Sequence, residues 1–255
     1  MKKLDKKIFL KSQLLTKLGV EHGFFTRNGG ISSDEYKSLN CKFNCSDKTE
    51  NVENNLITVT KLFNSNIKNL TKLIQIHSNK IIIANNSINK IEGDAIISNK
   101  KGNLLGVITA DCVPILIWEK VNGIVVAIHA GWKGALSGVI ENAINSLKKY
   151  EAYEFYAAIG PCIRQHNYEI DKKFYDLFVN NNPLNKNYFI NSTNKNRFLF
   201  DLPKYCYDKL IKCNASEVDD LQIDTYSNPN NFFSCRRAFH NNQKHFGCQI
   251  SVIKL

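Results

Sequence analysis

Two histidines and one cysteine, each at the end of an apolar segment, are the residues of this chain best suited to chemistry. His77 follows Leu-Ile-Gln-Ile, Cys112 follows Ile-Thr-Ala-Asp, and His129 follows Val-Val-Ala-Ile. Two imidazoles and one thiolate form a ligand set that Zn²⁺ prefers, and a three-ligand site leaves the fourth position for water or substrate, as in catalytic zinc centres. The residues are too widely separated for a local zinc finger. We therefore expect them at the ends of different strands of one sheet.

The loop after His129 combines this candidate ligand with a candidate anion site. Gly131, Lys133 and Gly134 lie between an apolar strand and a helix predicted over residues 134–150. N–H groups in the first turn of a helix have no partner within the helix and attract anions. Lys133 adds a cation, so we expect phosphate to bind here. The alternative interpretation is that His129 is a buried histidine in a tight turn.

Three further residues are candidates for contacts with substrate or for proton transfer. Arg27, before a glycine-rich turn, could clamp phosphate or carboxylate with two hydrogen bonds, or lie on the surface beside a hairpin. Asp111, next to Cys112, could orient a ligand histidine or carry protons, or cap the bend. Asp94, at the start of an apolar strand, could contact substrate or carry protons, or be an ordinary turn residue.

Composition excludes several classes of protein. The net charge of +11 comes from scattered lysines, and no nucleic-acid-binding motif is present, so the positive field favours a small anionic substrate instead. There is no run of about 18 apolar residues and no signal-like region, so we expect no membrane span and a cytoplasmic location with reduced cysteines. No linker or repeat divides the chain, so residues 1–255 are expected to form one domain.

The periodicity of apolar residues predicts many strands and few helices. Helices are predicted over residues 51–63, 134–150, 171–179 and 203–211, and a surface loop over 180–196. Strands are predicted over residues 22–27, 72–77, 80–84, 104–110, 113–118, 124–130, 154–160 and 249–255. Because the two kinds of element do not alternate regularly, we expect an α/β or α+β layered sandwich with a mixed sheet. No G-x-G-x-x-G motif supports a dinucleotide-binding fold.

The motifs together resemble one family of bacterial proteins, called polyphenol oxidases, laccase-domain proteins or peptidoglycan editing factors and also described as zinc-dependent purine nucleoside enzymes. The matching segments lie between residues 22 and 237 and include HGFFTRNGGIS, QIHS, GDAIIS, ITADCVPILI, AIHAGWKG, YEI and TYSNPNNFFSCRR. The resemblance implies a single α/β domain related to toxin-type cysteine hydrolases. It also implies a zinc site at His77, Cys112 and His129.

For activity, the resemblance implies phosphorolysis of adenosine, inosine, guanosine and methylthioadenosine, together with deamination of adenosine. Three alternatives stay open. Copper could occupy the same ligands in a phenol oxidase, although six histidines without an H-x-H pair cannot furnish a multicopper centre. Cys112 could be the nucleophile of a hydrolase acting on peptidoglycan precursors, with His129 or His77 as the base. The chain could also be a metal-carrying protein without activity.

Overall fold

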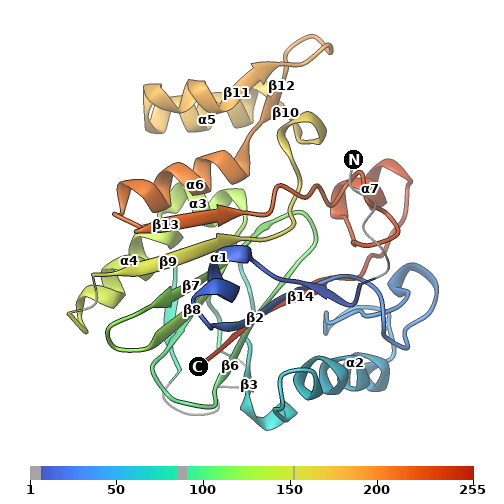
Figure 1. Ribbon diagram of the computed structural model, residues 1–255. Coiled ribbons are helices and arrows are strands. Elements are labelled where there is room, and N and C mark those ends of the chain that lie inside the picture. Colours follow the sequence, from blue (N-terminus) through green and yellow to red (C-terminus); the bar gives the residue numbers. More distant parts are fainter. Residues whose placement is uncertain (1–6, 85–90, 152) are drawn as a thin grey trace.

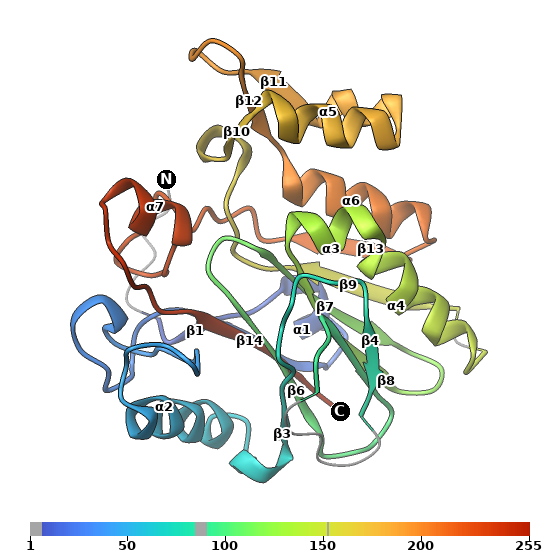
Figure 2. The same ribbon diagram turned by 180° about the vertical axis from the view of Figure 1, so that it is seen from behind.

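Two β-sheets stacked face to face form the body of the molecule, with helices on both outer sides (Figures 1 and 2). The computed structural model describes residues 7–84, 91–151 and 153–255. One sheet contains, in spatial order, β13 (Glu217–Asp220), β9 (Phe155–Ile159), β7 (Val113–Glu119), β8 (Ile124–Ala130), β5 (Ala95–Ser98) and β4 (Ile81–Ile83). The other contains β1 (Phe9–Leu10), β2 (Glu21–Phe25), β14 (Gln249–Lys254), β6 (Leu104–Thr109) and β3 (Leu70–Thr71).

Both sheets mix parallel and antiparallel pairs. Strand β7 runs antiparallel to β8 and β9, whereas β4 is parallel to β5 and β13 is parallel to β9. In the second sheet, β14 is antiparallel to β2 and β6, and β3 is parallel to β6. The mixed α/β, single-domain layered fold predicted from the sequence is therefore confirmed. The relation to toxin-type hydrolases stays a prediction.

Alternation of side chains along the central strands explains the layers, because successive residues of a strand point to opposite faces. Ile115 and Val126 face helices α4 (Val139–Lys148) and α6 (Leu202–Lys212) on one side of the six-stranded sheet. Leu116 and Ala127 face the five-stranded sheet. Helix α2 (Thr49–Lys61) packs on the outer face of that second sheet. Strands buried on both faces need the continuous apolar runs that the sequence shows.

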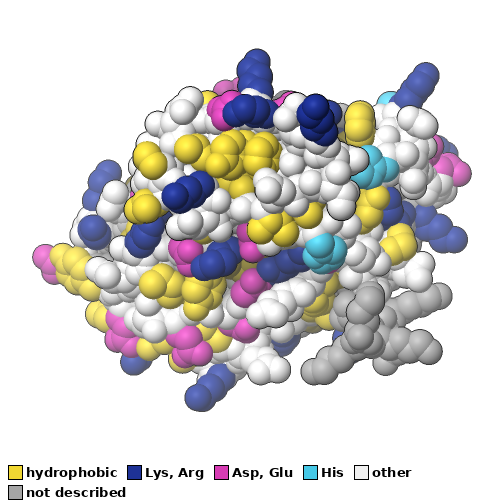
Figure 3. All heavy atoms as spheres, turned by 90° about the horizontal axis from the view of Figure 1, so that it is seen from above, with side chains coloured by type: hydrophobic (Ala, Val, Ile, Leu, Met, Phe, Trp, Pro, Cys, Tyr) yellow, Lys and Arg dark blue, Asp and Glu magenta, His cyan; other side chains and the backbone are white. Residues whose placement is uncertain are grey.

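A small third layer covers α6. It consists of helix α5 (Lys172–Asn181) and a sheet of β10 (Glu169–Asp171), β12 (Arg197–Phe200) and β11 (Phe189–Asn191). Phe178 and Phe200 pack there against Tyr205 of α6. Figure 3 looks down on this side of the molecule and shows hydrophobic side chains gathered among lysines and arginines. The loop predicted over residues 180–196 is wrong in part, since β11 and a 3₁₀ helix (η4, Pro183–Tyr188) lie within it.

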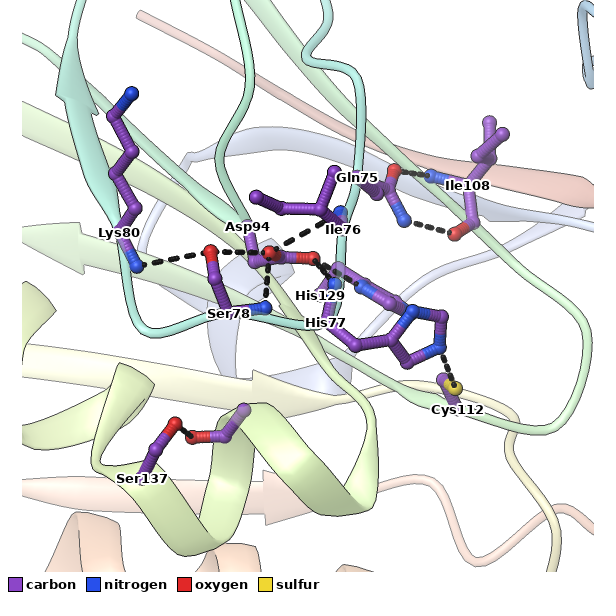
Figure 4. Close-up of polar contacts among 11 residues, drawn as sticks. Gln75, Ile76, His77, Ser78, Lys80, Asp94, Ile108, Cys112, His129 and Ser137 are labelled. Carbon is purple, nitrogen blue, oxygen red and sulfur yellow. Dashed lines mark hydrogen bonds and ion pairs between the residues drawn. The ribbon is translucent and has the colours of Figure 1, made fainter.

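The strand predicted over residues 72–77 is also wrong. Here the side chain of Gln75, and not the main chain, pairs with the neighbouring strand β6. Only Ile74 forms a bridge, to Glu92. The Gln75 amide instead pairs with the backbone of Ile108 in β6, donating to its carbonyl over 2.7 Å and accepting from its N–H over 2.8 Å (Figure 4). The segment is therefore a loop beside β6, and His77 does not have the extended backbone of a strand.

The helix predicted over residues 134–150 is two helices, α3 (Trp132–Ser137) and α4. Gly138 separates them with φ of 92°, a left-handed conformation that favours glycine. The remaining helices are short: α1 (Gln13–Lys17), α7 (Cys235–His240), and the 3₁₀ helices η1 (Asp34–Tyr36), η2 (Ile67–Asn69) and η3 (Gln165–Asn167). Among the described residues, no helix is long and apolar enough to cross a membrane.

Candidate metal centre

His77, Cys112 and His129 converge at one end of the six-stranded sheet. One ligand atom from each of the three lies within 4.8 Å of the others. The Cys112 Sγ is 3.7 Å from the His77 Nε2, and the two imidazole rings are 4.7 Å apart and nearly perpendicular (Figure 4). Within the described part of the chain, this is the one group of His, Cys, Asp or Glu side chains close enough to hold a metal.

The three candidate ligands lie in different kinds of backbone structure. His129 is the penultimate residue of β8 and is buried. Cys112 lies in the turn between β6 and β7, immediately after Asp111, whose φ is 88°. His77 has φ of 59°. Non-glycine residues rarely adopt these left-handed conformations, so the surrounding structure must hold both turns in place.

Gly131 makes the close approach of the ligands possible. A Cβ atom at this position would lie 2.5 Å from the His77 Cδ2 and 3.2 Å from the Cys112 Sγ. Any side chain would therefore push apart two of the three ligands. The glycine of the turn after His129 is required by the site itself, whatever its effect on the backbone.

Asp94 holds both ligand histidines. Its Oδ1 accepts from the His129 Nδ1 over 2.8 Å and from the backbone N–H of His77 over 3.0 Å. Its Oδ2 accepts from the backbone N–H and the hydroxyl of Ser78 over 2.6 and 2.7 Å (Figure 4). Burial alone would raise the pKa of Asp94, but the donors on His129 and Ser78 hold it below its usual value. A carboxylate on Nδ1 leaves the Nε2 of His129 free to bind a metal.

Asp111 is also buried, but its carboxylate has other partners. Its carboxylate accepts hydrogen bonds from Thr225, from Ser234 and from the backbone N–H of Arg236, over 2.6, 2.9 and 2.7 Å. Burial raises the pKa of Asp111 in spite of these donors. Asp111 thus ties the segment that begins α7 to the turn that carries Cys112.

Arg27 and Lys133, the cations expected to bind phosphate, have different surroundings. The Arg27 side chain donates to the carbonyls of Lys37 and Pro229, and its guanidinium carbon lies 4.4 Å from the centre of the Phe233 ring. Lys133 is exposed in the first turn of α3. Burial lowers the pKa of His77, and the charges of His129 and Lys133 act in the same direction, which favours the neutral imidazole that binds metals.

A cavity of about 530 Å³ opens beside Cys112. Its lining includes Tyr168 and Phe239, which are aromatic, and Arg197 and Arg236, which are basic. Sequence reasoning did not single out these four residues. The signal for two of them was present in the YEI and FFSCRR segments, but it did not reveal that residues so distant in the chain share one cavity.

The donor set fits a metal ion. Burial raises the pKa of the Cys112 thiol far above its usual value, and nearby acidic groups add to this effect. The thiolate would therefore form only with a compensating cation, which a bound metal supplies. A cysteine, two histidines and a carboxylate behind one histidine are the components of a zinc site with an open coordination position.

Fold and site together define a mixed α/β protein with a His-Cys-His cluster that could bind a metal, beside a cavity. The chain belongs to the family described as multi-copper polyphenol oxidoreductase laccase, whose model matches residues 21–255. The resemblance drawn from the sequence motifs is confirmed.

Named relatives and a solved structure are similar to this chain over most of its length. Purine nucleoside phosphorylase RP494 of Rickettsia prowazekii is 34% identical over 89% of this chain and 93% of its own length. Purine nucleoside phosphorylase YlmD of Bacillus subtilis is 28% identical over 84% of this chain and 82% of its own. A solved structure of a Neisseria meningitidis protein matches with a TM-score of 0.88 and 29% identity, covering 98% of this chain and 99% of that one.

Proposed function

We propose that this protein is a zinc-dependent purine nucleoside phosphorylase. It would cleave adenosine, inosine, guanosine and methylthioadenosine with phosphate and would also deaminate adenosine. The observation that carries the proposal is the His77–Cys112–His129 cluster beside a cavity lined by aromatic and basic side chains. The names of the relatives support the nucleoside and phosphate as substrates.

In this proposal His77, Cys112 and His129 hold the metal, with zinc preferred and copper as the alternative ion. When bound, the metal would act as a Lewis acid on water or on a substrate oxygen. Asp94 fixes the tautomer of His129 and the position of the His77 backbone, so it acts through the ligands. We assign a positioning role to Asp111 as well, because three donors already occupy its carboxylate.

The test is a chromatographic assay of adenosine and inosine with and without phosphate. Adenine or hypoxanthine, formed together with ribose 1-phosphate only in the presence of phosphate, would support the phosphorylase. Inosine formed from adenosine without phosphate would support the deaminase. The absence of both reactions in protein loaded with zinc would contradict the proposal.

A cysteine hydrolase is the second candidate, and one distance favours it: the Cys112 Sγ lies 3.7 Å from the His77 Nε2, as in a nucleophile–base pair. The raised pKa of the half-buried thiol argues against it, because the thiolate is the nucleophile. Amidase activity on peptidoglycan precursors in metal-free protein would select this candidate. Oxidation of phenols by copper-loaded protein would select the oxidase.

A further inference from the structure

The cavity beside Cys112 contains two guanidinium groups from separate parts of the fold. Arg236 comes from α7 near the C-terminus, and Arg197 comes from the first position of β12 in the small sheet. We propose that Arg197 and Arg236 bind inorganic phosphate, and the phosphate group of a sugar phosphate product, in this cavity. The proposal rests on the proposed phosphorylase function and names the site of its anionic substrate.

Arg236 is held in place for such a role. Its backbone N–H donates to Asp111, its Nη1 donates to the carbonyl of Glu169 over 2.6 Å, and its guanidinium carbon lies 5.3 Å from the centre of the Tyr168 ring. One contact to a carbonyl leaves most of the five donors of an arginine available. Because these contacts fix the side chain, little conformational entropy would be lost when an anion binds.

Arg197 lies in the small sheet, at the first position of β12. Its side chain is exposed and forms no hydrogen bond or ion pair with any other described residue, although its backbone pairs within the hairpin. Arg197, Arg236 and Glu169 all line this cavity. Hydrogen bonds from Ser192 and Asn194 lower the pKa of Glu169, and the positive charges of Arg197 and Arg236 act in the same direction. Residues 39 positions apart in the chain therefore contribute two positive charges to one cavity.

The carboxylates of the cavity do not neutralise these arginines through direct contact. Asp111 accepts from its three donors, and the Glu169 Oε1 accepts from Ser192 and Asn194 over 2.5 and 2.8 Å. Among the residues that the structure describes, neither Arg197 nor Arg236 takes part in a side-chain salt bridge. Two guanidiniums without a bound carboxylate suit the planar, bidentate recognition of phosphate.

The arginine first expected to bind phosphate is less suited. The Nε and Nη1 of Arg27 already donate to backbone carbonyls, and its guanidinium lies over the Phe233 ring. Lys133 remains the competing cation, but an ammonium group offers a point charge without a fork. The comparison between Lys133 and the two arginines therefore decides where phosphate binds.

The test is steady-state kinetics of inosine phosphorolysis in the zinc-loaded full-length protein. For Arg197→Gln and Arg236→Lys we expect the KM for phosphate to rise about tenfold or more, because each loses charge-assisted hydrogen bonds to the anion. The KM for inosine and the zinc content should change by less than about twofold. Lys204→Gln, which removes an exposed lysine paired with Asp208 on α6, is the matched charge control.

Calorimetric titration of the same variants with inorganic phosphate separates this proposal from the proposed function. The wild type could bind phosphate without cleaving nucleosides, while Arg197→Gln loses phosphate binding. That result would overturn the phosphorylase and support the phosphate site. Turnover with an unchanged KM for phosphate in both arginine variants would overturn the site and leave the phosphorylase standing. A raised KM for phosphate in Lys133→Gln alone would likewise overturn it. Arg197 is exposed, so its variant is expected to fold if Arg236→Lys does not.

Discussion

Two buried aspartates flank the candidate metal centre, and their surroundings give them opposite properties. The Asp94 carboxylate accepts hydrogen bonds from the His129 imidazole and from backbone N–H groups of the loop that carries His77. The Asp111 carboxylate accepts hydrogen bonds from two hydroxyls and one backbone N–H of the C-terminal segment. The pKa of Asp94 is lowered and the pKa of Asp111 is raised, although both side chains are buried.

The difference shows that burial alone does not define the role of a carboxylate. Asp94 lies behind the ligands and orders them, whereas Asp111 connects the ligand turn to α7, from which Arg236 reaches the cavity. The metal half of the site is therefore built locally around Asp94. The cavity half depends on a contact between segments far apart in sequence.

The largest effect is expected when ligand geometry is broken and Asp94 is left unchanged. Gly131→Ala places a methyl group where the His77 ring and the Cys112 sulfur lie. We expect zinc affinity to fall by roughly 100-fold or more. Competition with a chromophoric chelator measures it. Wild-type affinity in this variant would show that Asp94 alone determines the geometry.

Removing the charge of Asp94 should have the next largest effect. Asp94→Asn keeps the size of the side chain but replaces one of its two acceptor oxygens with an NH2 group, so either His129 and His77 or Ser78 lose their acceptor. Such changes behind a metal ligand typically cost about 10- to 100-fold in metal affinity. The same chelator competition, supported by cobalt absorption spectra, would detect it. A change of less than about twofold would remove Asp94 from the site.

Asp111→Asn is the matched comparison, because it makes the same substitution on the other side. We expect zinc affinity to stay within about threefold of wild type. We expect the free energy of unfolding to fall by about 1–3 kcal/mol, since an NH2 group replaces one oxygen and either Thr225 or Ser234 and Arg236 lose an acceptor. Urea unfolding of the apoprotein measures the stability. A loss of zinc as large as that of Asp94→Asn would abolish the distinction between the two aspartates.

The smallest effect is a pH dependence that arises away from both aspartates. His22 is fully buried, and its Nε2 accepts a hydrogen bond from the Ser12 N–H while its Nδ1 lies against the Val20 carbonyl. Burial lowers the pKa of His22 below its usual value. The unfolded chain then binds more protons than the native one, so stability should fall as the pH drops below about 6.5. Urea unfolding between pH 7.5 and 5 would show this slope, and His22→Gln should reduce it. An equal slope in that variant would exclude His22.

Sequence reasoning predicted the three ligands because each ends an apolar segment, and apolar runs are local signals. It placed Asp94 and Asp111 near the site but could not assign their partners. Those partners depend on tertiary contacts, such as Thr225 and Ser234 meeting Asp111 from more than 100 positions away. The same limit applies to Arg27, whose guanidinium contacts the distant Pro229 and Phe233.

The errors in secondary structure have local physical causes. The segment before His77 has the composition of a strand, but Gln75 uses its side chain to pair with Ile108. The pattern over residues 134–150 is continuous for a helix, yet Gly138 adopts a left-handed conformation and divides it. In both cases one residue overrides a periodicity that is otherwise correct.

We propose that His77, Cys112 and His129 form a catalytic metal site. Its most direct test is elemental analysis of purified wild type and Cys112→Ala, with nucleoside turnover measured on the same samples. We expect about one zinc per chain in the wild type. We also expect Cys112→Ala to lose both zinc and turnover, with an unchanged circular dichroism spectrum. Wild-type turnover in Cys112→Ala, or full turnover in protein without metal, would contradict it.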